Sequence, residues 1–210
     1  MARKKSAPSA RWISGVVLTA VALLVGALTL GWYRSEVGDK GDGLLSTPVT
    51  TIGGEFSLLD TESRPFTDKD LAGKPYAMFF GFTYCPDVCP TTLWDVSQWL
   101  EALGPEADRL NFVYVSVDPE RDTPEQMKSY LSAFNPRIIG LTGPRENVDK
   151  ILAGYRVYAQ RVELDSGDYT MDHTATIYLM DAEGRFAGTI AYQEKAENAL
   201  TKLRKLIGVE

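Results

Sequence analysis

The chain has few of the residues that most often bind metals, since its 210 residues include two cysteines and one histidine. Iron–sulfur clusters and structural zinc sites usually take four cysteine or histidine ligands, which these residues are too few to supply. Internal repeats and low-complexity tracts are also absent from the sequence. The length suffices for one membrane segment and one domain of ordinary size. We therefore expect a single globular domain.

Positive charge is scarce outside the N-terminal region. Residues 35–210 carry 17 basic and 28 acidic side chains, a formal net charge near −11, whereas residues 1–34 carry five basic side chains and no acidic one. A domain this acidic repels nucleic acids and anionic lipid headgroups. We expect no nucleic-acid partner, and a basic or metal-bearing partner fits the charge better.

Charged residues are absent between Trp12 and Trp32, an apolar run of about the length that crosses a membrane. Four basic residues precede the run, a pattern that keeps the N-terminus in the cytoplasm. A cleaved signal peptide is the alternative, but no convincing small-residue cleavage site follows the run. No cysteine lies near its end for lipoprotein processing. The run therefore predicts an uncleaved anchor.

These features predict four regions along the chain. They are a cytoplasmic N-terminus at 1–11, a transmembrane anchor at 12–33, a glycine-rich flexible tether at 34–48 and a globular domain at 49–210. The first eleven residues are too short for a mitochondrial transit peptide. We expect a single-pass protein of a bacterial inner membrane, with its domain in the periplasm.

Beyond the tether, strand-like segments alternate with helix-like segments. Apolar runs at 76–82 and 110–117 are typical of strands buried on both faces of a sheet. A helix start follows each run, with Pro90 at the first and Thr123-Pro124 at the second. Further elements are expected as a hairpin at 56–66, strands at 137–141, 157–162, 174–180 and 185–190, and helices at 145–154 and 194–207. This order predicts an α/β fold, a thioredoxin-like mixed sheet flanked by helices, with one N-terminal transmembrane helix.

Cys85 and Cys89 lie where the first buried strand is followed by a helix. In a thioredoxin-like fold, the first cysteine of a pair ends a central strand and the second opens the next helix. Backbone N–H groups at a helix N-terminus favour a thiolate, so we expect Cys89 to act as a ligand or nucleophile. The three-residue spacer opens the loop more than a redox Cys-x-x-Cys does, which suits two sulfurs facing one ion. Asp87 in this loop is expected to be solvated or to cap the loop.

His173 directly precedes the expected strand at 174–180. In a thioredoxin-like fold the residues that enter this strand face the cysteine loop, and oxidoreductases of that fold usually have a cis-proline there. A histidine instead supplies a nitrogen that can bind a metal. Two thiolates and one imidazole favour Cu(I), and the same atoms with an added oxygen ligand can hold Cu(II). We therefore expect Cys85, Cys89 and His173 to form a copper site, which makes residues 49–210 a thioredoxin-like copper-binding domain.

Three motifs, in this order, resemble those of the Sco/SenC family. They are residues 85–90 (Cys-Pro-Asp-Val-Cys-Pro), 117–124 (Val-Asp-Pro-Glu-Arg-Asp-Thr-Pro) and 172–174 (Asp-His-Thr). The resemblance covers roughly residues 48–206 and the N-terminal anchor. It implies a membrane-tethered copper chaperone that helps build the dinuclear copper centre of cytochrome c oxidase, with Cys85, Cys89 and His173 as copper ligands.

The same resemblance implies the copper-centre subunit of the oxidase as a partner. A periplasmic copper donor and a thioredoxin-like reductant are further candidate partners. Residues 118–124 are expected to shape a loop and cap a helix rather than to take part in catalysis.

Other functions use the same two cysteines. A thiol-disulfide oxidoreductase would keep the cysteines of the oxidase subunit reduced, so whether the chain is an enzyme stays open. The two functions differ in their dependence on His173. Copper binding depends strongly on this residue, whereas disulfide exchange need not depend on it. A thiol peroxidase would need a threonine where Phe82 stands. A structural disulfide between Cys85 and Cys89 would leave the placement of the sole histidine unexplained.

The aromatic residues near the cysteines divide into two groups. We expect the sheet core to contain Phe79, Phe80, Phe82 and Tyr84. Trp94 and Trp99 lie off the apolar stripe of their helix and are a weak indication of a partner surface.

Overall fold

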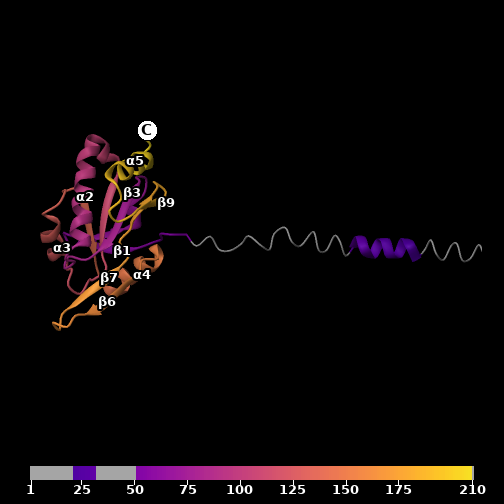
Figure 1. Ribbon diagram of the computed structural model, residues 1–210, viewed down its shortest axis with the longest axis horizontal. Coiled ribbons are helices and arrows are strands. Elements are labelled where there is room, and N and C mark those ends of the chain that lie inside the picture. Colours follow the sequence, from indigo (N-terminus) through magenta and orange to yellow (C-terminus); the bar gives the residue numbers. More distant parts are fainter. Residues whose placement is uncertain (1–20, 32–50, 210) are drawn as a thin grey trace, which may run out of the picture. The chain divides into compact units, whose positions relative to one another are not determined.

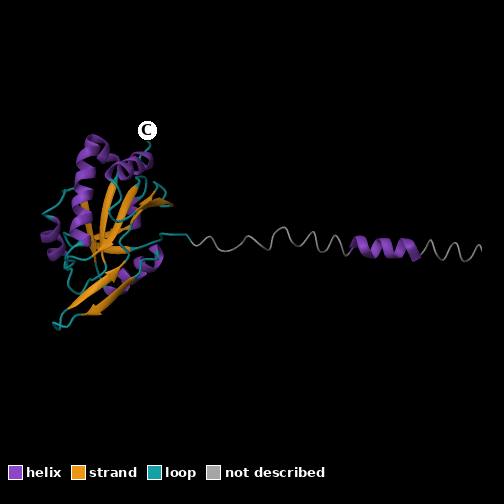
Figure 2. Cartoon of the chain, viewed as in Figure 1, coloured by secondary structure: helices purple, strands orange, loops and turns teal. Residues whose placement is uncertain are grey.

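The structure is a computed structural model that describes residues 21–31 and 51–209 (Figures 1 and 2). The expected cytoplasmic N-terminus, the tether at 34–48 and the remainder of the expected anchor lie outside the described residues. The chain divides near residue 50 into two units. In the first, residues 21–31 form a helix. Within the two described ranges, no helix is both long enough and apolar enough to cross a membrane.

The second unit contains a seven-stranded sheet with strand order β2-β1-β5-β4-β3-β8-β9. The strands are β1 (Ser57–Asp60), β2 (Pro65–Thr67), β3 (Tyr76–Gly81), β4 (Asn111–Ser116), β5 (Ile138–Thr142), β8 (Ile177–Met180) and β9 (Phe186–Ile190). The central strands β3, β4 and β5 run parallel, and the outer strands pair antiparallel. β6 (Ala159–Glu163) and β7 (Tyr169–His173) form a separate antiparallel hairpin, orange in Figure 1.

Helices cover both faces of the sheet. They are α2 (Val88–Leu103), α3 (Pro124–Leu131), α4 (Arg145–Tyr155) and α5 (Ala196–Leu206), with short 3₁₀ helices η1 (Asp68–Leu71) and η2 (Gly104–Arg109). α2 and α3 cross over between the parallel strands, and α3 packs so closely on β5 that a Cβ on Gly140 would lie 2.5 Å from the Leu131 side chain. α4 covers the opposite face, where Tyr155 packs on Phe80. The arrangement is a thioredoxin-like mixed α/β fold, as expected.

β3 lies at the centre of the core, and all six of its residues are buried. An unbroken apolar run suits this position, because both faces of the strand are covered by helices. The Tyr76 hydroxyl at its start hydrogen-bonds the Tyr155 hydroxyl at 2.8 Å, which connects β3 to α4. α3 begins as predicted, since Thr123 Oγ1 accepts from the backbone N–H of Gln126 at 3.2 Å and Pro124 takes the first helical position.

The hairpin of β6 and β7 is the main difference from the predicted elements. A strand was predicted at 157–162, but its antiparallel partner β7 was not, and the strand predicted at 174–180 begins at Ile177. The sequence of β7, Tyr-Thr-Met-Asp-His, does alternate as a half-buried strand does, so the signal was present in the sequence, but it is only five residues long and only Met171 is buried.

A buried polar turn follows β4. The Asp122 carboxylate accepts hydrogen bonds from the backbone N–H and hydroxyl of Thr83 and, at 2.6 Å, from the hydroxyl of Ser116. Burial raises the pKa of the Asp122 carboxyl, and these hydrogen bonds oppose that shift. The turn therefore fixes residue 83, two residues before the first cysteine. This geometry agrees with the structural function expected for residues 118–124.

Replacing Ser116 by alanine tests how much this turn contributes to the free energy of unfolding. The substitution removes one donor to the buried Asp122 carboxylate and the acceptor for the backbone N–H of Asp118. We expect the free energy of unfolding to fall by about 1.5–3 kcal/mol, measured by urea denaturation. Ser132→Ala, at an exposed position, is the matched control and is expected to change it by less than about 0.5 kcal/mol. Equal losses in the two variants would contradict the prediction.

Candidate metal centre

The two cysteines and the histidine come together beyond the C-terminal end of β3. Their ligand atoms all lie within 4.8 Å of one another. The Cys89 sulfur is 3.5 Å from His173 Nε2, and the backbone N–H of Cys89 donates to the Cys85 sulfur at 3.4 Å. Both cysteines are free thiols. Across residues 21–31 and 51–209, these three residues are the single group of three or more cysteine, histidine or acidic side chains close enough to share an ion.

The loop between β3 and α2 positions the cysteines. β3 ends at Gly81, and α2 begins one residue before Cys89, so the second cysteine opens the helix as predicted. Asp87 precedes the helix, is exposed and accepts a hydrogen bond from Thr91 at 3.3 Å. It lies outside the metal-binding cluster. The exposed position agrees with the prediction that Asp87 is not a ligand.

The His173 ring is oriented so that Nε2 faces the sulfurs. Nδ1 lies 3.0 Å from the carbonyl oxygen of Thr174. Because that oxygen only accepts, Nδ1 carries the proton, and Nε2 keeps a lone pair for a metal. Phe82 and Phe79 pack edge-on against the ring, with centroid distances of 5.8 and 6.3 Å. The ring is therefore held in a ligating orientation by contacts on two sides.

The two thiols differ strongly in acidity. The pKa of the Cys85 thiol is lowered to about 4, mainly by a hydrogen bond from the Cys89 thiol. The pKa of the Cys89 thiol is raised far above its usual range, because its proton is shared with Cys85 and its side chain is buried. The pair therefore holds one proton on Cys89, and Cys85 is the thiolate.

This distribution differs from the expectation that the helix N-terminus makes Cys89 the favoured thiolate. Cys89 has no exposed surface, whereas Cys85 is only partly buried. The hydrogen bond that the Cys89 thiol donates to Cys85, together with the desolvation of a buried thiolate, outweighs the attraction of the helix N-terminus. Burial depends on how α2 packs on the sheet, which the spacing of the cysteines does not show.

Arg121 connects the cysteine loop to the hairpin that carries His173. Its guanidinium lies 4.7 Å from the ring centroid of Tyr84 and 3.6 Å from that of Tyr169. It forms an ion pair with buried Asp118 at 2.5 Å and donates to the Tyr169 carbonyl at 2.9 Å. The Tyr169 hydroxyl donates to the same Asp118 carboxylate at 3.0 Å. Sequence analysis placed Arg121 in a motif but gave no signal for Tyr169.

Two expectations for the aromatic residues are wrong. Tyr84 was expected in the sheet core, but it is 53% exposed and packs on Arg121 beside Cys85. Trp99 was expected at a surface, but it is 5% exposed, whereas Trp94 is 59% exposed. The core positions expected for Phe79, Phe80 and Phe82 are confirmed.

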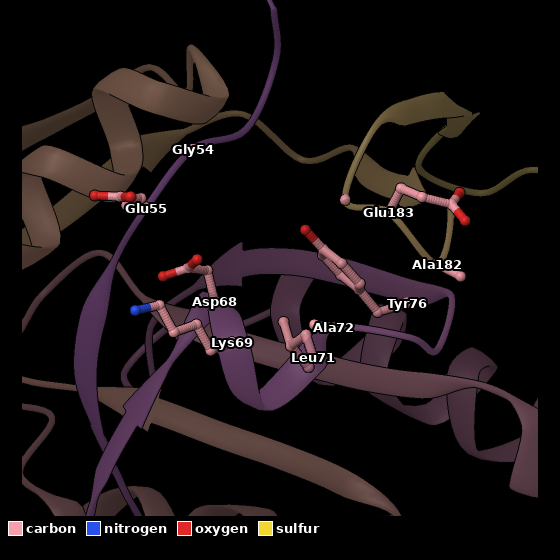
Figure 3. Close-up of a pocket in the computed structure, with 10 residues that line it drawn as sticks. Gly54, Glu55, Asp68, Lys69, Leu71, Ala72, Tyr76, Ala182 and Glu183 are labelled. Atoms are coloured by element: carbon pink, nitrogen blue, oxygen red, sulfur yellow. The ribbon is translucent and has the colours of Figure 1, made fainter.

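A cavity of about 320 Å³ lies at the start of β3 (Figure 3). The Tyr76 side chain borders it, together with the charged side chains of Glu55, Asp68, Lys69 and Glu183. The cavity contains no cysteine or histidine, and the metal-binding cluster follows the other end of the same strand. The two are separate features of the fold.

The three ligands fit copper better than other biological metals. Two sulfurs and one imidazole nitrogen suit the trigonal coordination that Cu(I) accepts. The cluster has no fourth protein ligand of the kind that a structural zinc site usually has. Cys85 and His173 are each partly exposed, so an ion can enter from solvent and leave again.

The chain is similar to known proteins over most of its length. The SCO1/SenC family model matches residues 46–208. Human "Protein SCO1 homolog, mitochondrial" is 41% identical over 177 residues, covering 80% of this chain and 58% of that protein. "Protein SCO2, mitochondrial" of Saccharomyces cerevisiae is 38% identical over 176 residues, covering 82% of this chain. The chain spans 58% of the length of that yeast protein as well.

A solved structure is similar over the same part of the chain. It is that of ScoI from Bradyrhizobium japonicum with copper bound, which is 50% identical and has a TM-score of 0.70. The similarity covers 74% of this chain and 99% of the ScoI chain. With a family match over residues 46–208 and these relatives, the chain belongs to the SCO1/SenC family.

Proposed function

We propose that the chain is a copper metallochaperone that helps assemble the dinuclear copper centre of cytochrome c oxidase. The observation that carries this proposal is the cluster of Cys85, Cys89 and His173. Cys89 and His173 are 84 residues apart in sequence, yet their sulfur and nitrogen are 3.5 Å apart. The copper-bound ScoI structure supports copper as the ion. The oxidase as recipient is supported by the family membership.

The site binds copper as cargo, in a defined order. The Cys85 thiolate and the free Nε2 of His173 are available from solvent, whereas the Cys89 sulfur is buried and protonated. Coordination by all three ligands therefore releases the proton of Cys89. During transfer, the recipient's ligands replace the partly exposed Cys85 and His173 first, and Cys89 is released last. Stepwise exchange of this kind keeps the ion coordinated throughout.

Anchoring in a bacterial inner membrane completes the proposal. The apolar run at 12–33 is the proposed single-pass anchor, with the domain in the periplasm on a tether at 34–48. This arrangement gives the metal centre access to the copper-centre subunit of the oxidase. A periplasmic copper donor and a thioredoxin-like reductant are the proposed upstream partners.

Thiol-disulfide exchange is a second candidate function, favoured by the unequal thiols. The Cys85 thiolate attacks a disulfide of the target, forming a mixed disulfide and releasing one target thiolate. Cys89 then gives up its proton and attacks the Cys85 sulfur, which releases the second target thiol. The chain ends as a Cys85–Cys89 disulfide, and two electrons have passed to the target. An external dithiol reductant must then restore the pair.

Removing the imidazole distinguishes the two functions. We expect the reduced protein to bind one Cu(I) tightly, and His173→Ala to weaken the affinity by at least tenfold, on the order of the loss caused by disturbing a metal's surroundings. The measurement is an anaerobic Cu(I) titration of the full chain against a competing chelator. Asp87→Asn, in the same loop but outside the cluster, is the matched control and keeps the wild-type affinity. Unchanged affinity in His173→Ala would rule out the three-ligand site.

The acidity of Cys85 gives a pH prediction for the reduced, copper-free protein. Because the pKa of Cys85 is lowered to about 4, its thiolate is fully populated above about pH 5 and is lost as the pH falls through 4. Alkylation of Cys85 by iodoacetamide should therefore stay nearly constant from pH 8 to pH 5, as measured by mass spectrometry. An ordinary cysteine loses reactivity throughout that range.

Cys89→Ala is the matched variant in this experiment. It removes the thiol that donates to Cys85, so the pKa of Cys85 should rise and its alkylation should decline between pH 8 and pH 5. A wild-type rate that falls steadily with pH would contradict the proposed proton distribution.

Loss of the gene tests the assembly function in cells. Under copper limitation, we expect the oxidase to accumulate with an incompletely metallated dinuclear centre, measured by absorption and copper content of purified membranes. The full chain should restore the centre, whereas Cys85→Ser should not. In the same cells the chain should stay with the membranes after alkaline extraction. A fully assembled centre without the gene would refute the assembly function, and release by alkali would refute the anchor.

A further inference from the structure

Tyr114 on β4 has a buried hydroxyl with no hydrogen-bond partner among the described residues. The whole residue has no exposed surface. Buried tyrosine hydroxyls usually find a hydrogen-bond partner, because leaving the group unpaired costs free energy. The Tyr114 hydroxyl therefore needs an explanation that packing alone does not give.

The Tyr114 hydroxyl and a sulfur of the metal centre lie on the same side of Gly81. A Cβ placed on Gly81 would lie 2.7 Å from the Cys89 sulfur and 2.8 Å from the Tyr114 hydroxyl oxygen. The Cys89 sulfur and the Tyr114 hydroxyl oxygen therefore both lie against Gly81, in space that a side chain at this position would fill. The proton shared with Cys85 and the burial of Cys89 raise the pKa of the Cys89 thiol, and the Tyr114 hydroxyl opposes this by lowering it. A donor that stabilises a thiolate acts in that direction.

Aromatic packing holds the Tyr114 ring in place. The ring stacks on Phe79, with centroids 5.8 Å apart and planes inclined by 29°, and it packs on Tyr130 at 6.1 Å. Phe79 pairs with Tyr114 across the β3–β4 ladder, and it also contacts the His173 ring. The hydroxyl cannot turn away from Cys89 without displacing these rings. Its position is therefore fixed before a metal binds.

We propose that Tyr114 is a positioning residue of the metal centre, whose hydroxyl donates a hydrogen bond to the Cys89 sulfur in the copper-bound protein. The inference rests on the proposed function, because it takes Cys89 as a copper ligand. A hydrogen bond to a ligating sulfur withdraws electron density from it, which weakens its donation to Cu(II) more than to Cu(I). Tyr114 should therefore favour Cu(I) and raise the copper reduction potential.

Tyr130 provides a matched control. Its hydroxyl is also buried and unpartnered within residues 51–209, and its ring contacts Tyr114. Its hydroxyl is not among the atoms nearest to Gly81, where the Cys89 sulfur and the Tyr114 hydroxyl meet. Removing the Tyr130 hydroxyl changes core polarity and packing as much as removing that of Tyr114. An effect specific to the sulfur hydrogen bond should appear in Tyr114→Phe alone.

The experiment compares the copper-loaded full chain as wild type, Tyr114→Phe and Tyr130→Phe. The readouts are the midpoint potential of the bound copper, by mediator titration, and the sulfur-to-Cu(II) charge-transfer absorption. In Tyr114→Phe we expect the ratio of Cu(I) to Cu(II) affinity to fall about tenfold, which lowers the potential by about 59 mV for a one-electron couple. The absorption should move to longer wavelength. Tyr130→Phe should match the wild type in both readouts.

A second variant covers the case in which Tyr114→Phe folds poorly. Difluorotyrosine at position 114 keeps the ring and strengthens the hydroxyl as a donor, so it should raise the potential and shift the absorption to shorter wavelength. Wild-type values in both position 114 variants, or equal shifts in Tyr114→Phe and Tyr130→Phe, would overturn the inference and leave the proposed function standing. Failure of the wild type to bind copper would overturn both.

Discussion

The burial of the Cys89 sulfur is the constraint on which the site depends. Cys89 opens α2, and the packing of that helix on β3 places its sulfur against Gly81 with no exposed surface. A thiolate in this environment is costly, so the proton stays on Cys89 and the charge moves to the partly exposed Cys85. A cysteine loop lying on the surface would give two similar thiols. Packing of the helix therefore contributes to the difference in acidity between Cys85 and Cys89, which both proposed functions use.

A second constraint is that His173 must be positioned at the site from a distant part of the chain. The histidine ends β7, outside the main sheet, and the hairpin has few buried side chains of its own. The ion pair of Arg121 with Asp118 and the stacking of Arg121 on Tyr169 attach the hairpin to the turn after β4. Buried ion pairs contribute little net stability, but they fix geometry where apolar contacts would permit several arrangements. Here the geometry that is fixed is that of the proposed ligand His173.

Sequence patterns predicted the parts of the fold that depend on local regularities. The buried strand before Cys85, the helix start at Thr123 and the position of His173 opposite the cysteines all follow from periodicity, capping or known fold topology. The first helix was also predicted, but α2 begins at Val88, two residues before the predicted start at Pro90. The unpredicted parts depend on which surfaces pack together. The exposure of Tyr84, the pairing of β7 and the protonation of Cys89 belong to this second class. No single stretch of sequence determines them.

The proton on Cys89 also relates the two functions to each other. Copper binding requires both sulfurs as thiolates, so the ion must displace that proton. Disulfide exchange uses the same proton in its second step, when Cys89 resolves the mixed disulfide. A Cys85–Cys89 disulfide offers no thiolate to copper at all. Copper loading and dithiol oxidation are therefore mutually exclusive states of one pair, and a pair that has become a disulfide must be reduced before it can take part in the proposed copper transfer.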